Sequence, residues 1–172
     1  MTGSHPERAN AGEARDLTAA IVRYAWDGQG LTRIKGILTN GETRMMDKET
    51  SDNFPAYTRI GDLQCHHFVT YIPEEAKSIS VSLKGAPGFD LALMMDHDTY
   101  AYPDVARYVS NLAGSEKDLS FEHLAPGFWY IAVQCLTTVD VTEGENCQEY
   151  SGRTDVLNGV PYSISVSWEL PE

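Results

Sequence analysis

The chain has 172 residues, of which 42% are hydrophobic and 22% charged, a composition that excludes a disordered or fibrous protein. Its 13 basic and 25 acidic residues give a formal net charge of −12, which opposes binding to nucleic acids and anionic membranes. No run reaches the roughly 18 consecutive apolar residues of a membrane-spanning helix. We therefore expect neither a nucleic-acid partner nor a membrane span.

The first predicted element is an amphipathic helix over residues 11–26, with Asn10 as its N-cap. The helix would pack on the rest of the chain, on a neighbouring domain or on another copy. Residues 1–36 carry five basic and four acidic side chains, whereas residues 37–172 carry eight and 21, so two regions are expected. These are a helix or linker over 1–30 and a main domain over 31–172. The apolar side chains of the helix recur every three or four residues: Ala14, Leu17, Ile21, Tyr24 and Ala25.

From residue 31 onward, apolar and polar residues alternate in short runs, which predicts β-strands. The polar stretches 43–56, 95–117 and 138–159 are expected to be loops. Strands of this length with turns between them predict a mainly β fold, an antiparallel two-sheet, jelly-roll-like β-sandwich accompanied by the N-terminal α-helix. The expected strands are 31–38, 65–72, 78–84, 89–94, 118–121, 128–135 and 162–168. The expected core residues are Ile79, Val81, Leu83, Leu91, Ile131, Val133, Ile164 and Val166.

Three sequence blocks, in this order, resemble the bacterial pre-peptidase C-terminal domain (PPC) family, whose members are β-sandwiches appended to secreted peptidases. The first is Ile72-Pro73 followed by Ala76–Gly85 (AKSISVSLKG), the second is Gly88–Leu93 (GFDLAL) and the third is Leu124–Val133 (LAPGFWYIAV). Tyr162–Trp168 fits the closing strand of the family. The resemblance covers residues 32–168. In the second block only Asp90 matches the family's acidic positions, and the 95–117 stretch and the helix depart from its pattern.

The resemblance implies a non-catalytic accessory module that assists substrate or surface binding, secretion or maturation of a secreted bacterial peptidase. One implied partner is an upstream catalytic domain, of which the helix over 11–26 would be the last element. The other is that enzyme's protein or polysaccharide substrate. The implied location is secreted, periplasmic or on the cell surface. Residues 1–16 contain no apolar core of a secretory signal, so the sequence is either cytosolic or part of a longer precursor. The alternative function is a carbohydrate-binding β-sandwich of a glycosidase or surface protein.

The sequence contains no GxSxG, HExxH, Walker or GxGxxG motif, so no enzyme is expected within this chain. Cys65 and His67 share one face of a predicted strand, but their spacing is poor for a nucleophile and its base. For metal binding, hard oxygen ligands suit Ca²⁺, and calcium is the only cofactor suggested. The candidate ligands, in or beside one predicted loop, are Asp90, Asp96, Asp98 and Asp104. The alternative is a solvated acidic loop.

Two further features bear on function. Tyr100 and Tyr102 lie in the predicted 95–117 loop and are candidates for stacking on a sugar or peptide, whereas Trp129 and Trp168 are expected to fill the core. Among three cysteines, Cys135 ends a predicted strand and Cys147 follows after a polar stretch. A Cys135–Cys147 disulfide would close that loop, the alternative being two reduced thiols.

Overall fold

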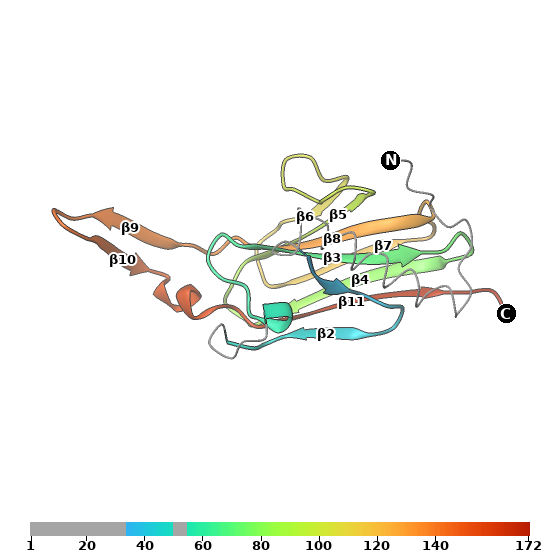
Figure 1. Cartoon of the computed structure of the whole chain (residues 1–172), viewed down its shortest axis with the longest axis horizontal. Coiled ribbons are helices and arrows are strands. Elements are labelled where there is room, and N and C mark those ends of the chain that lie inside the picture. Colours follow the sequence, from blue (N-terminus) through green and yellow to red (C-terminus); the bar gives the residue numbers. More distant parts are fainter. Residues whose placement is uncertain (1–33, 50–54) are drawn as a thin grey trace.

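The computed structural model describes residues 34–49 and 55–172. Within these residues, nine strands form two sheets and two more form a separate hairpin (Figure 1). The fold is thus the predicted mainly β, two-sheet sandwich. The predicted helix over 11–26 and the predicted boundary at residue 30 lie outside the described residues. No helix in the described part of the chain is long and apolar enough to cross a membrane.

The first sheet has five strands, and its central strand β8 is apolar on both faces, as the sequence predicts. Neighbouring strands are antiparallel except β1 and β3, which pair in parallel with Ile37 opposite Val69. The spatial order is β1 (Ile34–Ile37), β3 (Cys65–Ile72), β8 (Gly127–Cys135), β5 (Leu91–His97) and β6 (Tyr108–Ser110).

The second sheet has four strands, all antiparallel to their neighbours. Its central pair, β4 and β11, contains the clearest alternation in the sequence, with apolar residues facing inward and serines facing outward. The spatial order is β2 (Thr43–Met46), β11 (Tyr162–Glu169), β4 (Lys77–Gly85) and β7 (Glu116–Phe121).

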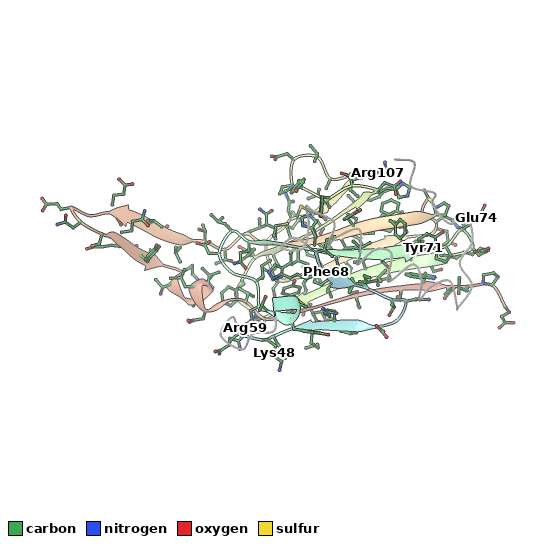
Figure 2. The ribbon with its side chains drawn as sticks, in the orientation of Figure 1. Lys48, Arg59, Phe68, Tyr71, Glu74 and Arg107 are labelled. Carbon is green, nitrogen blue, oxygen red and sulfur yellow. The ribbon has the colours of Figure 1, made fainter. Side chains whose placement is uncertain are left out.

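The hydrophobic core lies between the two sheets. All eight predicted core residues are buried there, each at most 1% exposed. Trp129 is 1% exposed and fills the core as predicted, and Trp168 packs partly buried against it. Phe68, from the inner face of β3, lies in the body of the molecule in Figure 2 and belongs to the same core. Burial of this apolar surface is the main force that holds the sheets together.

All three stretches predicted to be loops contain strands. The 43–56 stretch forms β2, and the 95–117 stretch holds the end of β5, all of β6 and the start of β7. The 138–159 stretch forms a hairpin of β9 (Val139–Glu143) and β10 (Gln148–Gly152), followed by a short 3₁₀ helix, η3 (Thr154–Asn158). Another 3₁₀ helix, η2, spans Pro55–Tyr57.

The β9–β10 hairpin projects away from the two-sheet body (Figure 1). Its two strands pair with each other and with no other strand in the described part of the chain. We call residues 139–152 the arm. Because the arm belongs to neither layer of the sandwich, its residues after Val139 add nothing to the hydrophobic core.

Candidate functional site

Aromatic side chains gather on the outer face of the five-stranded sheet, which points away from the core. In β3 and β8, odd-numbered Tyr71 and even-numbered Phe128 and Tyr130 point outward, because side chains alternate along a strand and the core takes the other set. Tyr71 lies opposite Phe128 in the register, with their ring centroids 5.2 Å apart. With two tyrosines from the β5–β6 loop, these residues form what we call the aromatic face: Tyr71, Tyr100, Tyr102, Phe128 and Tyr130.

The β5–β6 loop folds back over this outer face. Ala101 is completely buried there against Met94 and Ala132. The imidazole Nε2 of His67 lies 3.1 Å from the Ala101 carbonyl oxygen, and the pair fixes the loop against β3. A small second cluster of apolar side chains therefore holds the loop in place.

Tyr100 and Tyr102, the residues predicted to bind a ligand, flank this anchor. The Tyr100 ring lies 5.0 Å from the rings of both His67 and Tyr130, and Tyr102 lies 5.5 Å from His67. The two tyrosine rings are 6.1 Å apart and tilted by 40°, so they do not form a flat platform. Tyr102 is 39% exposed, whereas Tyr100 is half-buried.

The sequence-based prediction missed the other three aromatic residues of this face. Both sets of alternating side chains in 128–135 are apolar, which predicts a central strand covered on both sides. The available signal was that an outward aromatic pair, Phe128 and Tyr130, sits in a strand beside another outward aromatic residue, Tyr71. That signal could be read only with the strand order, which the sequence does not contain.

The four aspartates predicted as calcium ligands are spread over the length of β5 and beyond it. Asp90 precedes the strand and Asp96 lies near its end, and six residues of extended chain span about 20 Å. The Asp90 carboxylate accepts a hydrogen bond from the Gly114 backbone nitrogen (2.6 Å), which fixes the neighbouring loop. Asp90 therefore cannot share one ion with Asp96.

The remaining aspartates lie at the other end of β5. Asp96 is 8% exposed, and its Oδ1 accepts a hydrogen bond from the His97 backbone nitrogen (2.8 Å) and lies 3.9 Å from Arg107 Nε. Asp98 Oδ2 lies 3.6 Å from His97 Nδ1, and Asp104 is exposed in the β5–β6 loop. In residues 34–49 and 55–172, no group of three or more His, Cys, Asp or Glu side chains is arranged to hold a metal ion.

Cys65 and His67 share the outer face of β3, as their spacing predicts. Burial raises the pKa of the Cys65 thiol to about 11, which opposes formation of the nucleophilic thiolate. The His67 imidazole is held by the Ala101 carbonyl. Cys65 is therefore in the environment of a structural cysteine, and His67 holds the β5–β6 loop against the sheet.

Of the two alternatives for Cys135 and Cys147, a disulfide or reduced thiols, the structure contains the reduced thiols, since all three cysteines are free. Cys135 is buried at the end of β8, where its Sγ lies 3.4 Å from the Thr137 carbonyl oxygen. Cys147 is exposed in the turn that joins β9 to β10. The five residues of β9 separate the root of the arm from this turn by about 16 Å, too far for a disulfide. The loop that the disulfide was expected to close is held by hairpin pairing instead.

The arm is the most exposed part of the fold. Every residue from 140 to 155 is exposed. Val141 and Tyr150 face each other across the hairpin, and they are 51% and 52% exposed. Residues 139–152 contain no lysine or arginine but four carboxylates, Asp140, Glu143, Glu145 and Glu149. The arm thus presents an apolar pair surrounded by negative charge.

The root of the arm is firmly attached to the body. Val139 at its start and Val156 just after it are both buried in the main core. Between them, Arg153 binds Asp155 through two hydrogen bonds of 3.0 and 2.9 Å, and its guanidinium carbon lies 4.9 Å from the centre of the Phe89 ring. An isolated two-stranded hairpin is only marginally stable in water, and these root contacts fix its position.

No protein-family model matches the sequence, and a search of curated proteins finds no match either. Among solved structures, the chain is similar to the pre-peptidase C-terminal domain of a collagenase from Bacillus anthracis. The sequence identity is 14% and the TM-score 0.38, over 78% of this chain and 93% of that one. That collagenase domain belongs to the family that the three sequence blocks resemble. At such identity and TM-score, the similarity carries no information about ligand or activity.

Proposed function

We propose that the chain is a non-catalytic accessory module and that its arm binds polypeptide. The observation that carries this proposal is the pair Val141 and Tyr150, half-exposed at the centre of a hairpin that projects from a complete core. Apolar side chains held in water on an element that does not serve the core are typical of interaction surfaces. Tyrosine is also enriched at the centres of protein interfaces.

The arm suits an extended segment of protein. The outer edges of β9 and β10 have no strand partner in the described part of the chain, and such edges accept an added strand through backbone hydrogen bonds. The four carboxylates favour a segment that carries lysine or arginine. Both features favour polypeptide over a neutral polysaccharide.

The three sequence blocks support a more specific role. They lie on the end of β3 with β4, on β5 with the turn before it, and on β8 with the turn before it, and they resemble the PPC family. We propose that the chain serves as the accessory domain of a secreted bacterial peptidase and acts outside the cell, in the periplasm or on the cell surface. In this role the arm would hold the protein substrate near an attached catalytic domain.

The test is binding of the full chain to two kinds of immobilised material. The first is reduced and alkylated lysozyme, an unfolded basic protein, and the second is a neutral polysaccharide, cellulose or starch. We expect retention on the unfolded protein that weakens as salt rises, because the carboxylates of the arm contribute by charge. Val141→Ser combined with Tyr150→Ser should reduce the retention at least tenfold.

Leu112→Ser is the matched control, since Leu112 is 79% exposed on the body and lies outside the arm. Its retention should equal that of the unaltered chain. Equal retention of the arm variant would contradict the proposal. Retention on the polysaccharide, lost in Tyr102→Ala, would favour the carbohydrate-binding alternative, for which the 39% exposure of Tyr102 is the supporting observation.

A further inference from the structure

The two faces of the arm differ in their side chains. Side chains alternate along a strand, and residues directly opposite each other in an antiparallel pair share a face. One face therefore carries the apolar pair Val141 and Tyr150, and the next pair on this face toward the tip is Glu143 and Gln148. Glu149 lies on the other face. We call the first the Val141 face; it combines an exposed apolar pair with a single carboxylate.

Two residues of this face also offer their backbone groups to a further strand. Across the turn, the Gly144 nitrogen donates a hydrogen bond to the Cys147 carbonyl oxygen (2.8 Å). Hydrogen-bonded and non-hydrogen-bonded pairs alternate along an antiparallel hairpin, so the pairs that contain Glu143 and Val141 are non-hydrogen-bonded. The backbone N–H and C=O groups of Val141 and Glu143 therefore point to the outer edge of β9, which has no strand partner among the described residues.

Charge distinguishes the edge of β9 from that of β10 on the Val141 face. Glu143 is exposed and forms no ion pair within residues 34–49 and 55–172. The equivalent position on β10 is the neutral Gln148, whose Oε1 accepts a hydrogen bond from the Tyr150 hydroxyl (3.3 Å). A basic side chain on this face thus has its partner at the edge of β9. A second arm does not fit there, because residues 139–152 contain four carboxylates and no lysine or arginine.

We propose that the outer edge of β9 binds an extended segment in which a lysine or arginine stands two positions before an apolar residue. In an added antiparallel strand, the direction that is more stable per residue, the apolar residue lies opposite Val141. The residue two positions before it then lies opposite Glu143 on the same face. The residue between them points to the other face and can vary. This inference rests on the polypeptide binding proposed above and adds the edge, the direction and the sequence pattern.

The test is an NMR titration of the full chain with two eight-residue peptides of identical composition. Each contains one lysine and one phenylalanine among serines and threonines. In the first peptide the lysine stands two positions before the phenylalanine, and in the second it directly precedes it, so that the two side chains point to opposite faces. We expect the first peptide to bind about threefold more tightly, the effect of one cross-strand pair. The largest shifts should be those of the Val141 and Glu143 amides.

Two charge reversals then test the role of Glu143. Glu143→Lys should abolish the preference for the first peptide and favour a third one, in which glutamate replaces the lysine. Glu149→Lys is the matched control, because it makes the same change of charge on the other face of the arm. It should weaken binding of both lysine peptides equally and keep the threefold preference between them.

The outcomes separate this inference from the proposed function. Equal affinities for the first two peptides, or the same loss of preference in both variants, would overturn the pattern and leave polypeptide binding by the arm in place. Absence of shifts in residues 139–152 with any peptide would overturn both. Arm resonances that move with protein concentration in the absence of peptide would show that a second copy occupies the edge, which also contradicts the inference.

Discussion

A buried histidine on β3 makes the fold sensitive to acid. His66 is 3% exposed, and its Nδ1 lies 2.7 Å from the hydroxyl oxygen of Tyr162, so this bond joins the two sheets. Burial, with smaller contributions from Lys35 and His67, lowers the pKa of His66 to about 3. The histidine therefore stays neutral in the folded protein at pH values where it is already charged in the unfolded chain.

Because the folded pKa lies below the unfolded value of about 6.5, the unfolded state binds more protons between pH 6.5 and 3. Stability is therefore lost as the pH falls through this window. We expect His66 to contribute a loss of about 2 kcal/mol between pH 7 and pH 5. This loss of stability is measured by urea unfolding at pH 7 and pH 5, for the unaltered chain and for His66→Asn. The amide of asparagine can keep the bond to Tyr162. A pH dependence identical in the two proteins would contradict the assignment.

The three thiols differ in exposure and should differ in reactivity. Burial raises the pKa values of Cys65 and Cys135 to about 11, whereas Cys147 is exposed at the tip of the arm. A thiol reagent should modify one cysteine rapidly in the folded protein and all three after unfolding without reductant. Cys147→Ser should abolish the rapid phase. Detection of only one thiol after unfolding would show that two of the cysteines form a disulfide, contrary to the structure.

The acidic residues around β5 give an expectation for metal binding. Asp90 and Asp96 lie at opposite ends of this strand, and Asp96 is engaged by His97 and Arg107. We therefore expect millimolar Ca²⁺ and Mg²⁺ to change the melting temperature equally, through general screening of the negative charge. A rise specific to Ca²⁺ that is lost in Asp98→Ala would show a calcium site instead.

Among the elements, the seam between β1 and β2 depends on one arginine. Arg44 from β2 donates hydrogen bonds through Nη2 to the carbonyl oxygens of Lys35 (3.0 Å) and Ala56 (2.9 Å). Its guanidinium lies over the Tyr57 ring, 4.0 Å from the centre. A side chain at Gly36 would place its Cβ 2.9 Å from the same Nη2. The guanidinium thus joins the edges of the two sheets, and a Cβ at position 36 would displace it.

We expect Arg44→Lys to destabilise the fold by about 1–3 kcal/mol, because an ammonium cannot reproduce the planar contacts to two carbonyls and a ring. Gly36→Ala should destabilise it as well by displacing the guanidinium. Chemical unfolding measures both variants. Arg107→Lys, which alters an arginine whose side chain is 53% exposed and lies outside this seam, is the control and should leave stability nearly unchanged. If Arg44→Lys were as stable as this control, the seam would not depend on the guanidinium.

The sequence was sufficient for some elements and not for others. Strands β3, β4, β8 and β11 could be predicted because each buries at least one alternating set of side chains. The missed strands β2, β6, β9 and β10 are short and largely exposed, so hydrophobic alternation does not mark them. They are strands because neighbours offer backbone partners, as β11 does for β2, and that pairing is tertiary information.

In the candidate site, too, some residues could be predicted from the sequence and others could not. Tyr100 and Tyr102 could be selected from the sequence because aromatic residues in a polar loop are unusual. Tyr71, Phe128 and Tyr130 could not be, because their direction depends on which strand face the core takes. The arm was predicted as a loop, although its acidic residues and Cys147 were already visible in the sequence.

At the scale of the whole molecule, the fold combines a closed core with two surfaces outside it. The aromatic face lies beside the entry of the chain at β1, and the arm projects from the body (Figure 1). Val139 and Val156, at the root of the arm, connect it to the core, while residues 140–152 remain exposed.

The most direct test of the central claim, that the arm binds polypeptide, is amide hydrogen exchange of the full chain with and without saturating reduced and alkylated lysozyme. We predict slower exchange within residues 139–152, strongest near Val141 and Tyr150, where an added strand would bond to the open edges. The strands of the body should exchange at unchanged rates. Unchanged exchange in the arm, with protection around Tyr100 and Tyr102 instead, would contradict the claim.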